Sequence, residues 1–145
     1  MDIERIVASL KKDEGFSPTA YWDVSRWSIG FGTLAPHGSA VISYKEAEAA
    51  LMDALQEAIK DFETIFSDCR DIISDPRAEV FIQLLYNMGR KRVLGFPRMI
   101  HFARLGMWME SAYELQDSKW FREDLKGNAR ARRLVRQLAT GKREE

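Results

Sequence analysis

Cysteine and long hydrophobic runs are the two features that this 145-residue sequence most clearly lacks. The single cysteine, Cys69, excludes a disulfide framework within the chain and a cysteine-rich metal site. Charges interrupt the N-terminal stretch MDIERIVASLKKDEG every few residues, so this stretch lacks the apolar core of a signal peptide. No segment approaches the roughly 20 apolar residues of a membrane-spanning helix. We therefore expect synthesis in a cytoplasm, without a recognisable Sec signal and without stable membrane insertion.

Histidine is scarce as well, and the common catalytic motifs are missing. His37 and His101 stand alone, without a partner at metal-ligand spacing, so the sequence implies no metal and no cofactor. The GFG at 30–32 is too short for a phosphate-binding loop and no Lys-Ser/Thr follows it. A nucleophile elbow for Ser-His-Asp catalysis is not present. These absences argue against nucleotide, metal and serine-hydrolase chemistry.

Charge is balanced overall but unevenly placed. The 22 basic residues offset the 22 acidic ones, yet nine Lys/Arg stand against five Asp/Glu over 116–145. A basic C-terminal face could meet an anionic polymer, although a solvated helix end explains any single charge equally well. The 46% of hydrophobic residues is typical of a globular domain with one core, so we expect a single domain over 1–145.

Hydrophobic spacing predicts a mostly helical protein with a small sheet near its N-terminus. Helical periodicity over 2–12 stops at Gly15 and Pro18. Aromatic and β-branched residues with two glycines predict an antiparallel hairpin over 20–34. Ser43 and Glu46 form a capping box that begins a long helix over about 43–67. Further helices are predicted from Asp75-Pro76 to Gly89, from Pro97 to about Gly106, and over 107–116 and 129–139.

The predicted fold class is α+β and predominantly α. A small N-terminal α/β-hairpin lobe, about 13–42, is joined by the long helix to an all-helical C-terminal lobe, about 68–145. The first helix, 2–12, is expected to pack on the C-terminal lobe.

Two carboxylates in the segment DEGFSPTAYWDVSRWSIGFGT, residues 13–33, are the strongest candidates for chemistry. Glu14 ends the first helix, where the helix dipole and aromatic packing favour the protonated carboxyl that a general acid needs. Asp23 lies in the polar turn of the hairpin, where solvent keeps it ionised, and the Ser28 hydroxyl could help it hold a water. Such a pair suits acid/base attack on a glycosidic bond. A solvated helix-end glutamate and a turn aspartate that caps its own backbone fit the same residues. Flat faces for sugar packing come from Tyr21, Trp22, Trp27 and Phe31.

This segment resembles the active-site segment of the phage lysozyme family, glycoside hydrolase family twenty-four. In that family a Glu-Gly ends the first helix, eight residues separate the glutamate from an aspartate or cysteine, and a Thr-Ile-Gly-Tyr-Gly strand follows. Glu14, Asp23 and SIGFG at 28–32 fit this layout. The resemblance continues in the same order through ISYKEAEAALMDALQEA, LLYNMG, GFPRMI, DSKWF and NARARRLVRQLATG, and so covers nearly the whole chain.

The sequence departs from the family pattern in the hairpin. Four residues rather than five separate Asp23 from Ser28, and the usual turn glycine is missing, which predicts a tighter turn. Ser28 stands where the family has threonine, so the hydroxyl is kept but the stiffening methyl group is lost.

The resemblance implies a lysozyme, an N-acetylmuramidase that lyses bacterial cell walls. It implies hydrolysis, with inversion, of the β-1,4 bond between N-acetylmuramic acid and N-acetylglucosamine. Glu14 would be the general acid, Asp23 the residue that orients the attacking water, and Ser28 its helper. The other implied site residues are Leu34, Tyr86 and Asn87, where the family contacts the glycan across its cleft, and a supporting Arg130 that approaches the catalytic glutamate.

The implied partners are peptidoglycan glycan strands, with no nucleic acid, and the protein is expected to be a monomer. Synthesis in a host cytoplasm would be followed by action in the periplasm or cell wall, after holin-dependent release or on a virion. A lytic transglycosylase of similar fold is one alternative, although Asp23 argues against it because a transglycosylase has no water to place. A non-catalytic wall-binding or virion structural module is the other, and the intact pair of Glu14 and Asp23 argues against that.

Overall fold

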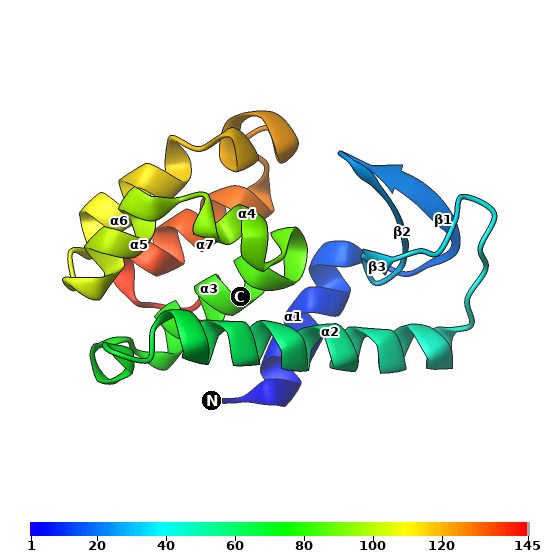
Figure 1. Cartoon of the computed structure of the whole chain (residues 1–145), viewed down its shortest axis with the longest axis horizontal. Helices are drawn as coiled ribbons and strands as arrows, with labels where there is room; N and C mark the ends of the chain where they lie inside the picture. Colours follow the sequence, from blue (N-terminus) through cyan, green and yellow to red (C-terminus); the bar gives the residue numbers. More distant parts are fainter. Residues whose placement is uncertain (145) are drawn as a thin grey trace. The chain divides into compact units, whose positions relative to one another are not determined.

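The computed structural model describes residues 1–144 and is mostly helical, with one small sheet near the N-terminus (Figure 1). The elements in chain order are α1 (Ile3–Glu14), β1 (Ser17–Asp23), β2 (Arg26–Gly30), β3 (Thr33–Leu34), α2 (Tyr44–Ile65), η1 (Arg70–Ile72), α3 (Asp75–Met88), α4 (Arg90–Leu94), α5 (Pro97–Arg104), α6 (Trp108–Gln116), η2 (Trp120–Asp124) and α7 (Ala129–Thr140). This order confirms the predicted fold class.

The chain divides into two compact units, Met1–Glu57 and the remainder from Ala58 onward, and α2 contributes residues to both. The predicted domain ends at Glu145, which lies outside the described residues. The packing of the first helix on the C-terminal lobe stays a prediction.

Helix α1 ends two residues later than its hydrophobic period suggests. The Asp2 carboxylate accepts a hydrogen bond from the Arg5 N–H at 3.1 Å and caps the start of the helix. Ile6 and Leu10 form its buried face. Gly15 takes a φ of 67° and donates its N–H to the Lys11 carbonyl, as glycines after helix ends commonly do. Glu14 is therefore the last helical residue.

The predicted hairpin is part of a three-stranded antiparallel sheet in the order β1-β2-β3. The sheet begins at Ser17, earlier than predicted, and gains β3 because the chain reverses again through Gly30 and Gly32, which both have positive φ. Directly paired residues share a face and successive residues alternate. The register therefore places two sets on opposite faces: Tyr21, Asp23, Arg26 and Ser28 on one, and Trp22 and Trp27 on the other.

A small apolar cluster supports the sheet in the first unit. Ile29, Ala35 and Ala40 are buried together, and Ala20 and Ile42 pack against them. The segment 35–42 runs back along β1, with hydrogen bonds from the Ala20 N–H to the Ala40 carbonyl and from the Ile42 N–H to the Pro18 carbonyl. Burial of these side chains holds the sheet against the segment 35–42, which leads into α2.

The predicted capping box is present at the start of α2. The Ser43 hydroxyl accepts from the Glu46 N–H at 3.1 Å, and the Glu46 carboxylate accepts from the Ser43 N–H at 3.0 Å. Leu51, Leu55 and Phe62 of α2 are fully buried.

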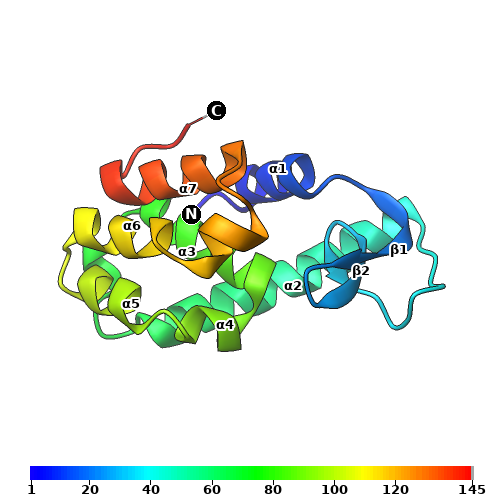
Figure 2. The ribbon, with the colours of Figure 1, turned by 90° about the horizontal axis from the view of Figure 1, so that it is seen from above.

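The second unit is built from helices around α3. Val80, Phe81 and Leu84 are fully buried, and the polar Glu79 and Gln83 are buried as well. Viewed from above, α6 lies between α5 and α7 (Figure 2). The start of α3 is confirmed, but its N-cap is Ser74 rather than Asp75, and Pro76 follows in the first turn. Three short elements were not predicted, η1, α4 and the π-helical turn η2, because none is long enough to show a period.

Candidate active site

Gly32 provides the surface against which the carboxyl group of Glu14 lies. A Cβ built on Gly32 would stand 2.5 Å from Glu14 Oε2 and 2.9 Å from its Cδ. Gly32 also has a φ of 81°, a conformation that favours glycine. The second glycine of the GFG segment, which does not fit a phosphate loop, is thus required here for close approach of a carboxyl group.

A lysine held by a carboxylate and two aromatic rings fixes the last turn of α1. Lys11 Nζ lies 2.6 Å from Glu48 Oε2 and 3.3 Å from the Tyr44 hydroxyl. The same ammonium lies 5.5 Å and 5.3 Å from the ring centres of Phe31 and Tyr44. Hydrogen bonds to Glu48 and then to Tyr44 raise the pKa of Lys11, so the ammonium form is favoured. Because Lys11 precedes Glu14 by one helical turn, these contacts hold the end of α1 against the start of α2.

Asp23 and Ser28 share one face of the hairpin formed by β1 and β2. Asp23 ends β1 directly opposite Arg26, and Ser28 lies two residues further along β2. The Ser28 side chain is fully buried, and its hydroxyl makes no hydrogen bond to any described residue. Buried hydroxyls normally have a hydrogen-bond partner, so Ser28 is an exception on the face that it shares with Asp23.

Arg26 links this face to the turn that carries Gly32. Its guanidinium Nη2 donates to the Gly32 carbonyl at 3.1 Å. Glu14 and the Arg26 side chain therefore both contact Gly32. The sequence interpretation did not single out Arg26. The available signal was its position as the one cation between Asp23 and Ser28.

The shortened hairpin turns through only two residues, Val24 and Ser25, as the tighter spacing predicts. Val24 has a φ of 55°, in the region where a two-residue loop normally carries glycine, asparagine or aspartate. The Ser25 N–H donates to the Asp23 carbonyl two residues earlier, as in a γ-turn. The strain of a β-branched residue at positive φ is thus located next to Asp23.

The remaining predicted site residues lie in both units. Leu34 belongs to the first unit, is exposed and pairs directly with Ser28 in the sheet. In the second unit, Tyr86 is buried near the end of α3, and the Asn87 side-chain carbonyl accepts from Trp120 Nε1 at 3.0 Å. Arg130 lies in the first turn of α7 and is half-buried.

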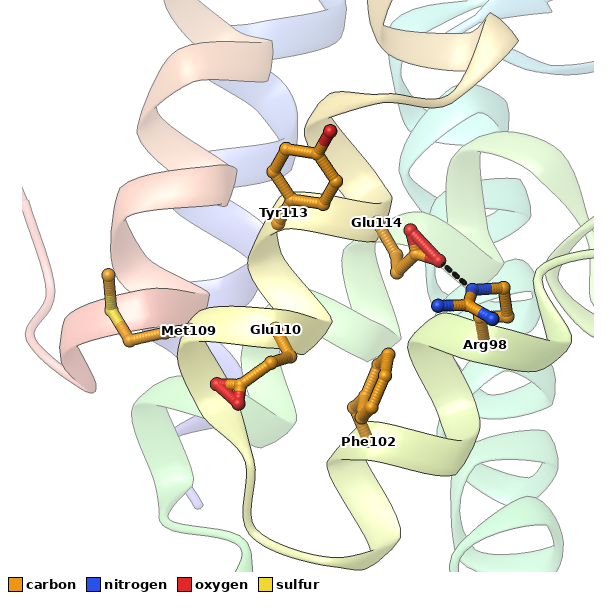
Figure 3. A pocket seen from close by; sticks show the side chains of 6 residues that line it. All are labelled: Arg98, Phe102, Met109, Glu110, Tyr113 and Glu114. Carbon is orange, nitrogen blue, oxygen red and sulfur yellow. Dashed lines mark hydrogen bonds and ion pairs between the residues drawn. The ribbon is translucent and has the colours of Figure 1, made fainter.

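A separate groove lies between α5 and α6 in the second unit (Figure 3). It encloses about 290 Å³, and an adjoining hollow of about 260 Å³ shares Arg98 and Glu114 with it. Arg98 and Glu114 form an ion pair, and the Arg98 guanidinium lies 5.5 Å from the Phe102 ring centre. No predicted catalytic residue lines either hollow, so this groove does not contain the acid/base pair.

The sequence matches the model of the family described as phage lysozyme over residues 11–140. No curated protein matches it significantly. Within residues 1–144, no helix is long and apolar enough to cross a membrane.

Proposed function

The chain belongs to the phage lysozyme family and is therefore a glycoside hydrolase that degrades the peptidoglycan of the cell wall, and we propose that it acts as an inverting muramidase. The bond cleaved is the β-1,4 linkage between C1 of N-acetylmuramic acid and O4 of N-acetylglucosamine. The observation that carries this proposal is the convergence on Gly32: Glu14 lies against it, and Arg26, from the face of Asp23 and Ser28, bonds its carbonyl.

Glu14 is the general acid in this proposal. Its protonated carboxyl transfers a proton to the glycosidic oxygen O4 as the C1–O4 bond breaks. The position of Glu14 at the end of α1, with its carboxyl group against Gly32, supports this role because a proton donor must be held in one geometry.

Asp23 and Ser28 place the attacking water. The Asp23 carboxylate accepts one proton of the water as the water oxygen bonds to C1. The Ser28 hydroxyl orients the same water. Attack on the face of the sugar opposite the leaving oxygen inverts the configuration at C1. The shared face of the two side chains supports this role.

The resemblance to the family supports the remaining assignments. We propose that Leu34, Tyr86 and Asn87 contact the glycan and that Arg130 supports the general acid. We also propose a monomer in which the two units form one lysozyme-like domain, acting after holin-dependent release or from a virion.

Digestion of purified peptidoglycan with mass spectrometry of the new glycan ends tests the proposal. The wild-type protein should produce reducing muramic acid ends. The variants Glu14→Gln and Asp23→Asn should each lose about a hundredfold or more in rate. Glu110→Gln, a helix carboxylate of the second unit, serves as the matched control and should retain wild-type activity.

The alternatives give different products. Anhydro ends in place of reducing ends would identify a transglycosylase and remove the water-placing role of Asp23. The absence of cleavage by a folded wild-type sample that still sediments with peptidoglycan would identify a wall-binding module. Proton NMR of the first anomer released would show α for inversion, and β would contradict it.

A further inference from the structure

Two tryptophans form an exposed aromatic surface on the face of the sheet opposite Asp23. Trp22 and Trp27 pair directly across β1 and β2, with ring centres 5.4 Å apart and planes at 79°. Their exposed fractions are 60% and 40%. Cross-strand packing of the two rings stabilises the hairpin, but it leaves most of the Trp22 indole in solvent.

Close packing constrains Trp27 within this aromatic pair. Gly38 packs so closely on Trp27 that a Cβ there would lie 2.8 Å from the ring atoms Cε2 and Cζ2. Trp22 in turn stands in an edge-to-face arrangement with Trp27. Neither ring belongs to the buried cluster of Ile29, Ala35 and Ala40. Trp27 is thus held between Gly38 and Trp22 before any ligand arrives, which lowers the entropic cost of binding.

Polar groups border the aromatic surface on the side of Gly38. His37 and Ser39 flank Gly38 and are exposed, and the Ser39 N–H donates to His37 Nδ1 at 3.2 Å. A pyranose ring presents apolar C–H faces with hydroxyl and amide groups around its edge. Flat indoles beside a hydrogen-bonding loop match this pattern, whereas insertion into a bilayer would bring the polar loop into an apolar environment.

We propose that Trp22 and Trp27 form a second glycan-binding site, which stacks on an N-acetylated sugar ring of a peptidoglycan strand. The inference rests on the proposed function for its choice of ligand. Asp23 and Ser28 face the other side of the sheet. The part of the glycan held by the tryptophans is therefore not the part being cleaved. A second contact with an insoluble polymer raises the local concentration of substrate at the active site.

Sedimentation with insoluble peptidoglycan in the Glu14→Gln background measures binding without cleavage. Adding Trp22→Ala should weaken binding roughly threefold to tenfold, the range expected for one lost aromatic contact. Trp22→Phe keeps a flat ring and should restore much of the affinity. Tyr113→Ala removes an aromatic side chain of similar exposure, 64%, from the second unit and should leave binding unchanged. Thermal unfolding of each variant checks that the hairpin remains folded.

Soluble N-acetylglucosamine oligomers and anionic phosphatidylglycerol vesicles complete the test. The oligomers should change the fluorescence of the Glu14→Gln protein, and Trp22→Ala should lose that change. Equal binding of folded Trp22→Ala and its parent to peptidoglycan would overturn the second site while leaving hydrolysis by Glu14 intact. If Trp22→Ala lost binding to the vesicles but bound peptidoglycan as its parent does, the surface would be reassigned to a membrane contact. Wild-type protein that binds through Trp22 without cleaving would refute the proposed hydrolysis but not the binding site.

Discussion

At the scale of single residues, Gly32 is the position where a small change should disturb catalysis most selectively. We expect Gly32→Ala to lower peptidoglycan hydrolysis at least tenfold, because its methyl group would displace the Glu14 carboxyl that now occupies that space. Folding should lose about 1 kcal/mol from the positive φ alone. Initial rates on peptidoglycan and urea unfolding curves measure the two effects separately.

Gly106→Ala is the matched control for this substitution. Gly106 has a similar φ of 69°, but the nearest atom to an added Cβ is Ile72 Cδ1 at 3.8 Å. This variant should lose comparable stability and retain activity. Similar activity losses in both variants would show that backbone strain, rather than displacement of Glu14, is responsible.

Val24 is the residue at which the hairpin stores strain. Because its φ of 55° is unfavourable for a β-branched side chain and tolerated by asparagine, Val24→Asn should stabilise the protein by about 1 kcal/mol. The midpoint of urea unfolding measures this change. Val41→Asn, at an exposed valine without positive φ, should give no stabilisation. An equal gain in both variants would show that replacing an exposed apolar side chain, rather than relieving backbone strain, causes the stabilisation.

At the scale of elements, the capping box makes the start of α2 sensitive to acid. The hydrogen bond from the Ser43 N–H lowers the pKa of Glu46 below its ordinary value of 4.5. A lowered pKa in the folded state stabilises the protein above the unfolded pKa, and this stabilisation is lost as the pH falls through the folded value. Wild-type protein should therefore lose more stability than Glu46→Gln between about pH 6 and pH 3.

Unfolding curves across this pH range test the capping box. Glu57→Gln, an exposed carboxylate on the same helix, should retain the wild-type pH dependence. Ser43→Ala should cost about 1 kcal/mol at neutral pH because the Glu46 N–H loses its acceptor. A wild-type slope in Glu46→Gln would contradict the role of the ionised carboxylate.

Elements that depend on local signals could be predicted, and those that depend on contacts could not. The capping box and the prolines at helix starts act within a helical turn, and the helices they predict are present. The third strand was missed because it is only two residues long and exists through its pairing with β2. Similarly, η2 is a π-helical turn whose Trp120 is bonded to Asn87, a partner 33 residues away.

At the scale of the whole molecule, side chains distant in sequence tie the C-terminal segment to α3. Arg143 donates to the buried Glu79 carboxylate through Nε and Nη2 at 2.8–3.1 Å. Arg77 donates to the carbonyls of Leu138 and Ala139. These contacts join the start of α3 to the end of α7 and the residues after it.

Arg143→Ala should lower the free energy of unfolding by about 2–3 kcal/mol, because it leaves the Glu79 charge buried without this partner. Glu79→Gln added to Arg143→Ala should recover part of the loss, since the buried charge is then removed. Lys142→Ala, at the exposed neighbouring residue, should have little effect. Additive losses in the double variant, measured by urea unfolding, would contradict the pairing.

The sequence by itself determined the fold class, the family and the residues proposed for acid/base chemistry. The fold class rests on periodicity and capping, and the family and the proposed acid/base residues rest on the sequence segments that resemble phage lysozymes; all of these are patterns along the chain. Only the tertiary structure placed Glu14 against Gly32, bonded Arg26 to the Gly32 carbonyl and put the two tryptophans on the face opposite Asp23. Such contacts depend on strand register and on the close packing of side chains, and neither is specified by the spacing of residues along the chain.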